Sequence, residues 1–243
     1  IIIRGMGYQG LFWVDGSSCS SSILIFALLV KEKKKIDISS HIKTVETAVV
    51  SVFKDKIFWI FLFVCFITSM LFFQLFTTLP IYHHEKYGLT EVQTGLLMTL
   101  NGLLIFFLEM PLVSILERKN TLKLQIILWG SIFMTLSLFI LLIDIWAGVL
   151  VISVVFMSFG EMFIFPFSNS FALSRAPIGH EGRYMALFTM SFSLAHITSS
   201  KVGMGIISVY GYEVNWLFMG ILGIVSIAGC IWVKKLSLEE NRL

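Results

Sequence analysis

The hydrophobic residues of this chain fall into long runs separated by short polar connections. Seven runs reach about 20 residues or more, the length that an α-helix needs to cross a bilayer. They cover residues 11–30, 57–80, 94–116, 124–143, 146–173, 184–209 and 214–233. No segment alternates apolar and polar residues as a transmembrane β-barrel strand does. The pattern therefore predicts an all-α membrane protein with seven transmembrane helices.

The composition supports a membrane protein. Hydrophobic residues make up 57% of the 243 residues, charged residues 14%, and the mean hydropathy is +0.89. Soluble domains contain about 25% charged residues, so this composition excludes an ordinary soluble protein.

Basic residues concentrate in every second connection between the runs. These connections and the carboxyl end hold Lys31, Lys33, Lys34, Lys35, Lys43, Lys54, Lys56, Arg118, Lys119, Lys123, Arg175, Arg183, Lys234, Lys235 and Arg242. The alternate set holds only Arg4 and Lys86. Because cytoplasmic loops are rich in Lys and Arg, we expect a multi-pass protein of the inner (plasma) membrane. Its amino end would lie outside and its carboxyl end in the cytoplasm.

The segment 31–56 is the one long connection. A lysine run is followed by apolar residues at the helical spacing of Ile42, Val45, Val49 and Val52. This pattern predicts an amphipathic helix on the inner membrane surface. A solvated flexible linker is the alternative.

The two ends of the chain contain similar stretches. Residues 7–16 (GYQGLFWVDG) and 211–220 (GYEVNWLFMG) each precede an apolar run that ends in lysines. This similarity favours a parallel internal repeat in which the last helix corresponds to the first. Convergent interface chemistry, with an aromatic belt and a lysine stop, would give the same pattern.

Together these features resemble the major facilitator superfamily from its sixth to its twelfth transmembrane helix. The resemblance implies that 1–30 is the last helix of an amino-terminal six-helix half and 31–56 a basic cytoplasmic linker. Residues 57–235 would form the carboxyl-terminal six-helix half, and 236–243 a cytoplasmic tail. The start at Ile1 fits a fragment that lacks the first five helices, which would then be a partner of this half.

Two loops carry the resemblance most specifically. Residues 113–123 (VSILERKNTLK) resemble the second copy of the family motif G-x-x-x-D-R-x-G-R-R, with Glu117-Arg118 at the acidic-basic pair. The segment with Gly160-Glu161-Met162 and Gly182-Arg183 resembles helices ten and eleven of drug:proton antiporters. The resemblance implies a gating role for Glu117, Arg118 and Arg183, whereas ordinary interface charges are the alternative.

Glu161 is the leading candidate for binding a proton or substrate. It shares a helical face with Ser158, Phe165 and Ser168. An ionisable residue at membrane depth normally faces a bundle interior or a wet cavity and marks a transport pathway. Pairing with a neighbouring helix for packing alone is the alternative.

Other polar residues within the apolar runs are weaker candidates. Histidine is a residue type suited to proton sensing, which makes His196 a candidate, although a plain interhelical hydrogen bond is its alternative role. Lys201, in the same run, is a candidate that could instead snorkel outward. Glu109 precedes Pro111 and either binds substrate or stabilises a kink. The neutral residues Gln74, Asn101 and Asn169 are candidates too, with interhelical hydrogen bonding as the simpler role.

The sequence gives no reason to expect an enzyme. No nucleophile elbow, P-loop or zinc-protease motif occurs, and the three cysteines lack any paired spacing. His83-His84-Glu85 lacks two ligands at i and i+4 and falls in a predicted exposed outer loop, so no metal site is expected. We expect neither a cofactor nor a nucleic-acid partner.

The favoured interpretation is a secondary transporter with alternating access that couples proton entry to efflux of small molecules. Its partners would be a small-molecule substrate and the lipid bilayer, and this chain alone should not transport. Proton-coupled uptake of peptides or other solutes is the first alternative. A seven-helix receptor is a second, although the long first inner loop and the internal repeat disfavour it. A membrane scaffold would scatter its polar residues without shared faces.

Overall fold

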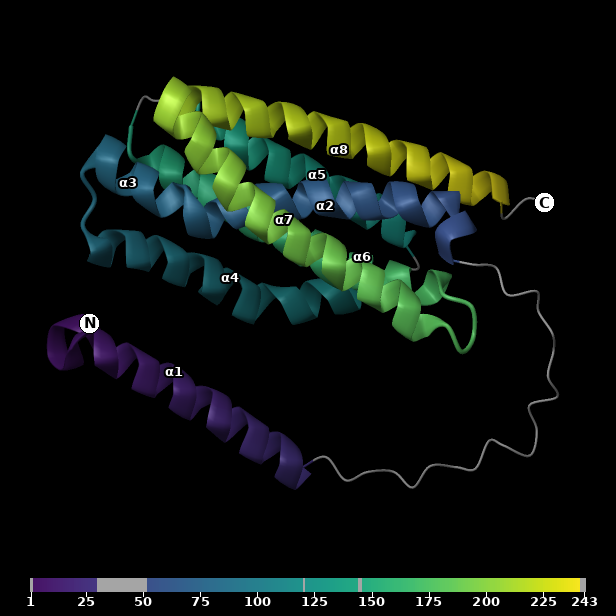
Figure 1. The fold of residues 1–243 in the computed structure, drawn as a ribbon, viewed down its shortest axis with the longest axis horizontal. Coiled ribbons are helices and arrows are strands. Elements are labelled where there is room, and N and C mark those ends of the chain that lie inside the picture. Colours follow the sequence, from purple (N-terminus) through teal and green to yellow (C-terminus); the bar gives the residue numbers. More distant parts are fainter. Residues whose placement is uncertain (1, 30–51, 120, 144–145, 241–243) are drawn as a thin grey trace. The chain divides into compact units, whose positions relative to one another are not determined.

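The computed structural model describes residues 2–29, 52–119, 121–143 and 146–240, and every secondary-structure element in these ranges is a helix (Figure 1). The elements are α1 (Ile2–Leu29), the 3-10 helix η2 (Val52–Lys54), α2 (Lys56–Thr77), α3 (Leu79–Tyr87), α4 (Glu91–Arg118), α5 (Lys123–Ile140), α6 (Gly148–Arg175), α7 (Glu181–Tyr210) and α8 (Tyr212–Glu240). The prediction of an all-α protein is confirmed.

All seven predicted runs contain a long helix. Among the described residues, five helices are long and apolar enough to span a membrane: α2, α4, α5, α6 and α8. The 30-residue α7 is not among them, since His196, Lys201 and several hydroxyl residues lower its hydropathy. α1 is also outside this set. The protein is a multi-pass membrane protein, and the polarity of α7 indicates a helix that does not face lipid all round.

The predicted run 57–80 divides into two helices. α2 ends at Thr77 and α3 begins at Leu79, with Pro80 in its first turn. Pro80 has no amide hydrogen to donate, so it suits a helix start and cannot continue α2. The expectation of a loop at His83-His84-Glu85 is therefore wrong, although His84 and Glu85 are exposed as expected. These residues lie in α3, and the His83 side chain is fully buried.

The chain forms two compact units, Ile1–Val49 and Val50–Leu243. In the first unit the structure describes α1, whose apolar side chains such as Phe12, Trp13 and Ile23 are exposed. Most of the predicted amphipathic helix or linker at 31–56 lies outside the described residues. The proposed domain boundaries and the internal repeat stay predictions.

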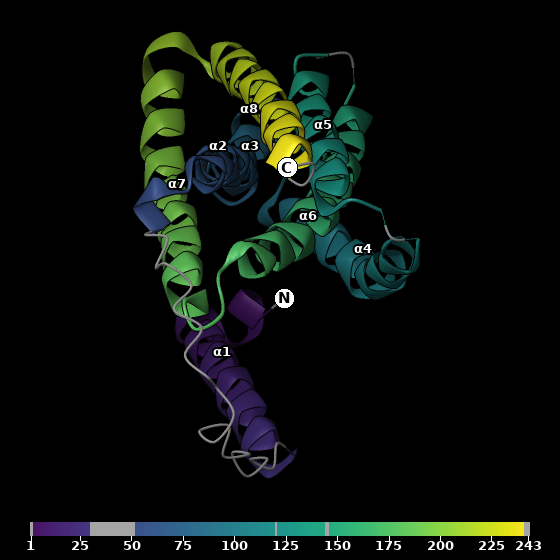
Figure 2. The same ribbon diagram turned by 90° about the vertical axis from the view of Figure 1, so that its right-hand side faces the viewer.

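The second unit is a helix bundle. α5 packs against α6 and α8, α2 packs against α7 and α8, and α4 packs against α6. Figure 2 shows α7 and α4 at opposite edges of this bundle. Its buried core has one cluster near α3, which includes Leu75 and Trp216, and another near the start of α2, which includes Phe58 and Tyr184. This arrangement leaves α4 with a single buried residue, Asn101.

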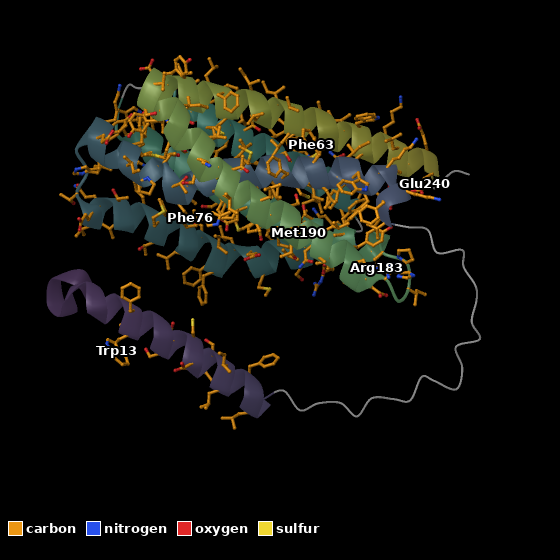
Figure 3. The ribbon with its side chains drawn as sticks, in the orientation of Figure 1. Trp13, Phe63, Phe76, Arg183, Met190 and Glu240 are labelled. Atoms are coloured by element: carbon orange, nitrogen blue, oxygen red, sulfur yellow. The ribbon has the colours of Figure 1, made fainter. Side chains whose placement is uncertain are left out.

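One end of the bundle gathers most of its basic residues, and we call it the basic end. It carries Lys54, Lys56, Arg118, Lys119, Lys123, Arg175, Arg183, Lys234 and Lys235 at the start of α2, between α4 and α5, between α6 and α7 and near the end of α8. Figure 3 shows Arg183 and Glu240 at this end. These are the Lys and Arg residues from which a cytoplasmic location of this end was predicted.

Candidate functional site

Glu161 on α6 faces Asn101 on α4. The Asn101 side chain, which is 6% exposed, donates from Nδ2 to Glu161 Oε2 at 3.2 Å and to Ser158 Oγ at 2.9 Å. Ser158 in turn donates to the carbonyl oxygen of Val154. We call Asn101, Ser158 and Glu161 the α4–α6 polar cluster. It holds one carboxylate, half-buried, between two apolar helices.

Local sequence explains how this cluster forms. Ser158 and Glu161 are three residues apart, so they lie on one face of α6, one turn from each other. Asn101 fills the matching position on α4, where α4 packs against α6. Glu109 is half-buried on α4, eight residues beyond Asn101. A carboxylate at membrane depth that accepts a bond from an amide can take up and release a proton.

The structure does not bring the other ionisable candidates into this cluster. His196 is exposed on α7, and its ring packs on that of Phe73 with centroids 4.3 Å apart. Lys201 is exposed on the same helix, and Asn169 is exposed on α6. Within the described residues none of the three forms a hydrogen bond or ion pair with Asn101, Ser158 or Glu161.

Gln74 is fully buried at the junction of α2, α7 and α8. Its Nε2 donates to the Ser199 carbonyl at 3.1 Å and to Ser199 Oγ at 2.8 Å. Its Oε1 accepts from Thr78 Oγ1 at 2.5 Å and from Asn215 Nδ2 at 3.3 Å. Both the nitrogen and the oxygen of the Gln74 amide are therefore hydrogen-bonded, and the residue joins α2, α7 and α8. This is the interhelical hydrogen bonding that the sequence analysis gave as its simpler role.

The Gln74 junction supports a stability prediction at Gly203 on α7. A Cβ built there would lie 2.9 Å from both amide atoms of Gln74, whereas one at Gly205 would meet nothing within 4 Å. We expect Gly203→Ala to destabilise the bundle by about 1 to 3 kcal/mol, the usual cost of overpacking. Thermal denaturation in detergent measures this. Gly205→Ala, the matched control, should not lose stability and could gain up to about 1 kcal/mol from the higher helix propensity of Ala; an equal loss in both variants would contradict the argument.

The gating candidates Glu117, Arg118 and Arg183 are exposed at the basic end and form no ion pair with one another in the described part of the chain. A different set of residues, which sequence reasoning missed, connects the helices there. Arg175 donates from Nε to Asp55 Oδ2 at 2.9 Å and from Nη1 to Glu240 Oε2 at 2.5 Å.

We call Asp55, Arg175, Tyr184 and Glu240 the basic-end clamp. Arg175 Nη2 also donates to Asp55 Oδ1 at 3.0 Å, and Tyr184 OH donates to Asp55 Oδ2 at 3.2 Å. Asp55 additionally caps α2 by accepting from the Phe58 amide. The clamp joins the start of α2 and the ends of α6 and α8 to the first turn of α7. The one sign of this clamp in the sequence is Asp55, an acidic residue just before the apolar run that begins at residue 57.

His83, in α3, is a buried histidine whose two ring nitrogens have no hydrogen-bond partner among the described residues. Burial lowers its pKa to about 4, so the ring is neutral at physiological pH. No group of three or more His, Cys, Asp or Glu side chains suited to a metal ion occurs in the ranges that the structure describes.

Known proteins resemble this chain over most of its length. The family profile described as Major Facilitator Superfamily matches residues 1–200. The "Uncharacterized MFS-type transporter YttB" of Bacillus subtilis (strain 168) is 28% identical over 164 residues, which cover 67% of this chain and 41% of that protein. The "Na(+), Li(+), K(+)/H(+) antiporter" of Planococcus maritimus is 18% identical over 205 residues, 79% of this chain and 47% of that protein.

The chain thus spans less than half the length of these two relatives. The profile, by contrast, covers well over half of the chain, including α1, α2 to α6 and much of α7. An all-helical membrane fold agrees with this match, and a receptor assignment does not. The chain belongs to the Major Facilitator Superfamily.

Proposed function

We propose that this chain is part of a secondary transporter in which the α4–α6 polar cluster binds the coupling proton. The observation that carries the proposal is the hydrogen bond from buried Asn101 to Glu161, which holds a carboxylate between two membrane-spanning helices. An ionised carboxylate in such surroundings is costly, so substrate or proton exchange can be linked to its charge state.

Alternating access gives this proton site its function. In the family's two-half architecture, the halves rock about a site near the bilayer midplane. Glu161 would accept a proton when the site faces one side and release it when the site faces the other. The proposal requires the proton as coupling ion and no organic cofactor. It places the basic end in the cytoplasm of an inner (plasma) membrane protein, in keeping with its lysines and arginines.

Efflux of small, partly hydrophobic compounds is the proposed direction and substrate class. An apolar groove of about 910 Å³ runs between α2 and α7 and includes Phe63, Met190 and Ile197 in its lining. Its lining suits a hydrophobic small molecule better than a peptide, whose backbone needs polar partners. This favours a hydrophobic small molecule over the alternative of a peptide as substrate.

Exchange of monovalent cations for protons is a second candidate. One relative is named as an Na(+), Li(+), K(+)/H(+) antiporter. Glu161 on α6 and Glu109 on the adjacent helix α4 supply carboxylate oxygens, the kind of ligand that hard cations prefer.

Everted membrane vesicles containing the complete gene product test the proposal. Respiration acidifies their interior, and a quenched pH dye then reports proton release when a substrate is added. We expect dye recovery with lipophilic amines and not with Na⁺, Li⁺ or K⁺. Recovery with the cations alone would favour the second candidate. Recovery with neither class, beyond that of vesicles from cells with an empty vector, would contradict proton-coupled efflux.

A further inference from the structure

A pocket of about 380 Å³ lies at the basic end, where α4, α5, α6 and α8 begin or end. It is separate from the α4–α6 polar cluster, and none of its lining residues belongs to the basic-end clamp. Lys123 on α5 and Lys234 on α8 line it, together with the buried rings of Phe167 and Phe171 on α6. The pocket thus combines positive charge with an apolar wall.

Both lysine side chains are held in place by hydrogen bonds to neutral oxygens. Lys123 Nζ donates to the Ser170 carbonyl at 3.2 Å, and Lys234 Nζ donates to the side-chain oxygen of Gln125. An ammonium group has three hydrogens to donate, so each retains capacity for a ligand. Glu117 is the acidic residue in the lining, and it forms no ion pair with either lysine in the described part of the chain. The pocket therefore carries net positive charge.

The start of α5 adds to this field. Leu122, the residue before the helix, offers no side-chain hydrogen bond to the first amides of α5. Uncapped amides at a helix start carry partial positive charge and favour a phosphate or carboxylate. The lysines and the helix start therefore act on the same space.

The rim of the pocket is apolar and exposed. Leu122 and Leu238 both line the pocket, and they are 53% and 38% exposed. A pocket facing only water gains nothing from such a rim, whereas at the end of membrane-spanning helices it can contact acyl chains. The pocket lies at the ends of helices long and apolar enough to span a membrane, where lipid headgroups are expected, and basic pockets between helices there bind anionic headgroups.

We propose that this pocket binds an anionic phospholipid, with its phosphate between Lys123 and Lys234 and its acyl chains against Phe167, Phe171 and the leucine rim. This lipid site lies outside the α4–α6 polar cluster, so the proposal does not depend on the proposed transport activity. A bound lipid would join α5 to α8 at the basic end and stabilise the bundle.

Titration of the purified, delipidated protein in detergent tests this proposal. The probes are phosphatidylglycerol, phosphatidylcholine and inorganic phosphate, and native mass spectrometry counts the bound lipid while thermal denaturation follows stability. We expect phosphatidylglycerol to bind and raise the melting temperature, and the other two probes to do neither. If inorganic phosphate stabilised the protein equally, the ligand of the pocket would be a free anion and the lipid proposal would be overturned. If phosphatidylcholine bound equally well, selection of an anionic headgroup by the lysines would be overturned.

Paired substitutions locate the site. Lys123→Gln with Lys234→Gln should weaken phosphatidylglycerol binding about thirtyfold, roughly fivefold for each lysine. The matched control, Lys119→Gln with Lys235→Gln, removes the same charge from exposed residues outside the pocket and should change binding less than about threefold. Lys123→Arg with Lys234→Arg should retain binding, which separates loss of charge from loss of folding. Equal losses in the Gln pair and its control would overturn the site.

Discussion

Arg175→Gln is expected to destabilise the bundle by about 2 to 3 kcal/mol, because it removes the guanidinium that holds two carboxylates. Most of this loss of stability comes from Asp55, whose side chain is only 8% exposed and would lose its cationic partner. Asp55 keeps its bonds from Tyr184 OH and the Phe58 amide, so the cost falls below that of a fully buried unpaired charge. Glu240 is 53% exposed and contributes little. Thermal denaturation in detergent measures the change.

Arg183→Gln is the matched control for this prediction. Arg183 has the same charge, lies near the start of α7 at the same end of the bundle, and is exposed. Its replacement should change stability by less than about 0.5 kcal/mol. Adding Asp55→Asn to Arg175→Gln should recover part of the loss, since the carboxylate left behind would then be neutral. Similar effects of Arg175→Gln and Arg183→Gln would show that the clamp is not a stabilising contact.

The helices of this fold could be predicted from the sequence because backbone groups in lipid must bond within their own segment. An apolar run of sufficient length therefore has essentially one structure open to it. The break at Thr78 was missed because the apolar run continues through it and hides the start of the short helix α3 at Leu79. The burial of His83 was missed for a different reason: a polar residue beyond a run is buried only if the surrounding helices cover it.

The candidate site was predictable in part. Glu161 stood out as a carboxylate within an apolar run, and Asn101 as an amide in another, but their pairing spans 60 residues of sequence. The clamp pairs Arg175 with Asp55 across 120 residues, at helix ends where charges are common. Which of many charges meet depends on the packing of α2, α6 and α8, and a single sequence does not contain that information.

Glu161→Gln is expected to reduce proton-driven exchange by about a hundredfold or more, since the replacement cannot take up a proton. The amide has nearly the same shape, and its oxygen can still accept the hydrogen bond from Asn101. Folding should therefore be retained. Dye recovery in everted vesicles that contain the complete gene product measures exchange, and thermal denaturation of the purified variant checks the fold.

Two further glutamates make this result specific. Glu239→Gln makes the same chemical change at an exposed position near the end of α8 and should leave exchange unchanged within about twofold. Glu109→Gln removes the other carboxylate of this helix pair but leaves the bond between Asn101 and Glu161 intact, so exchange should continue. If Glu109→Gln abolished exchange and Glu161→Gln did not, Glu109 would be the proton site. In that case the bond between Asn101 and Glu161 would serve helix packing alone, the alternative that the sequence left open.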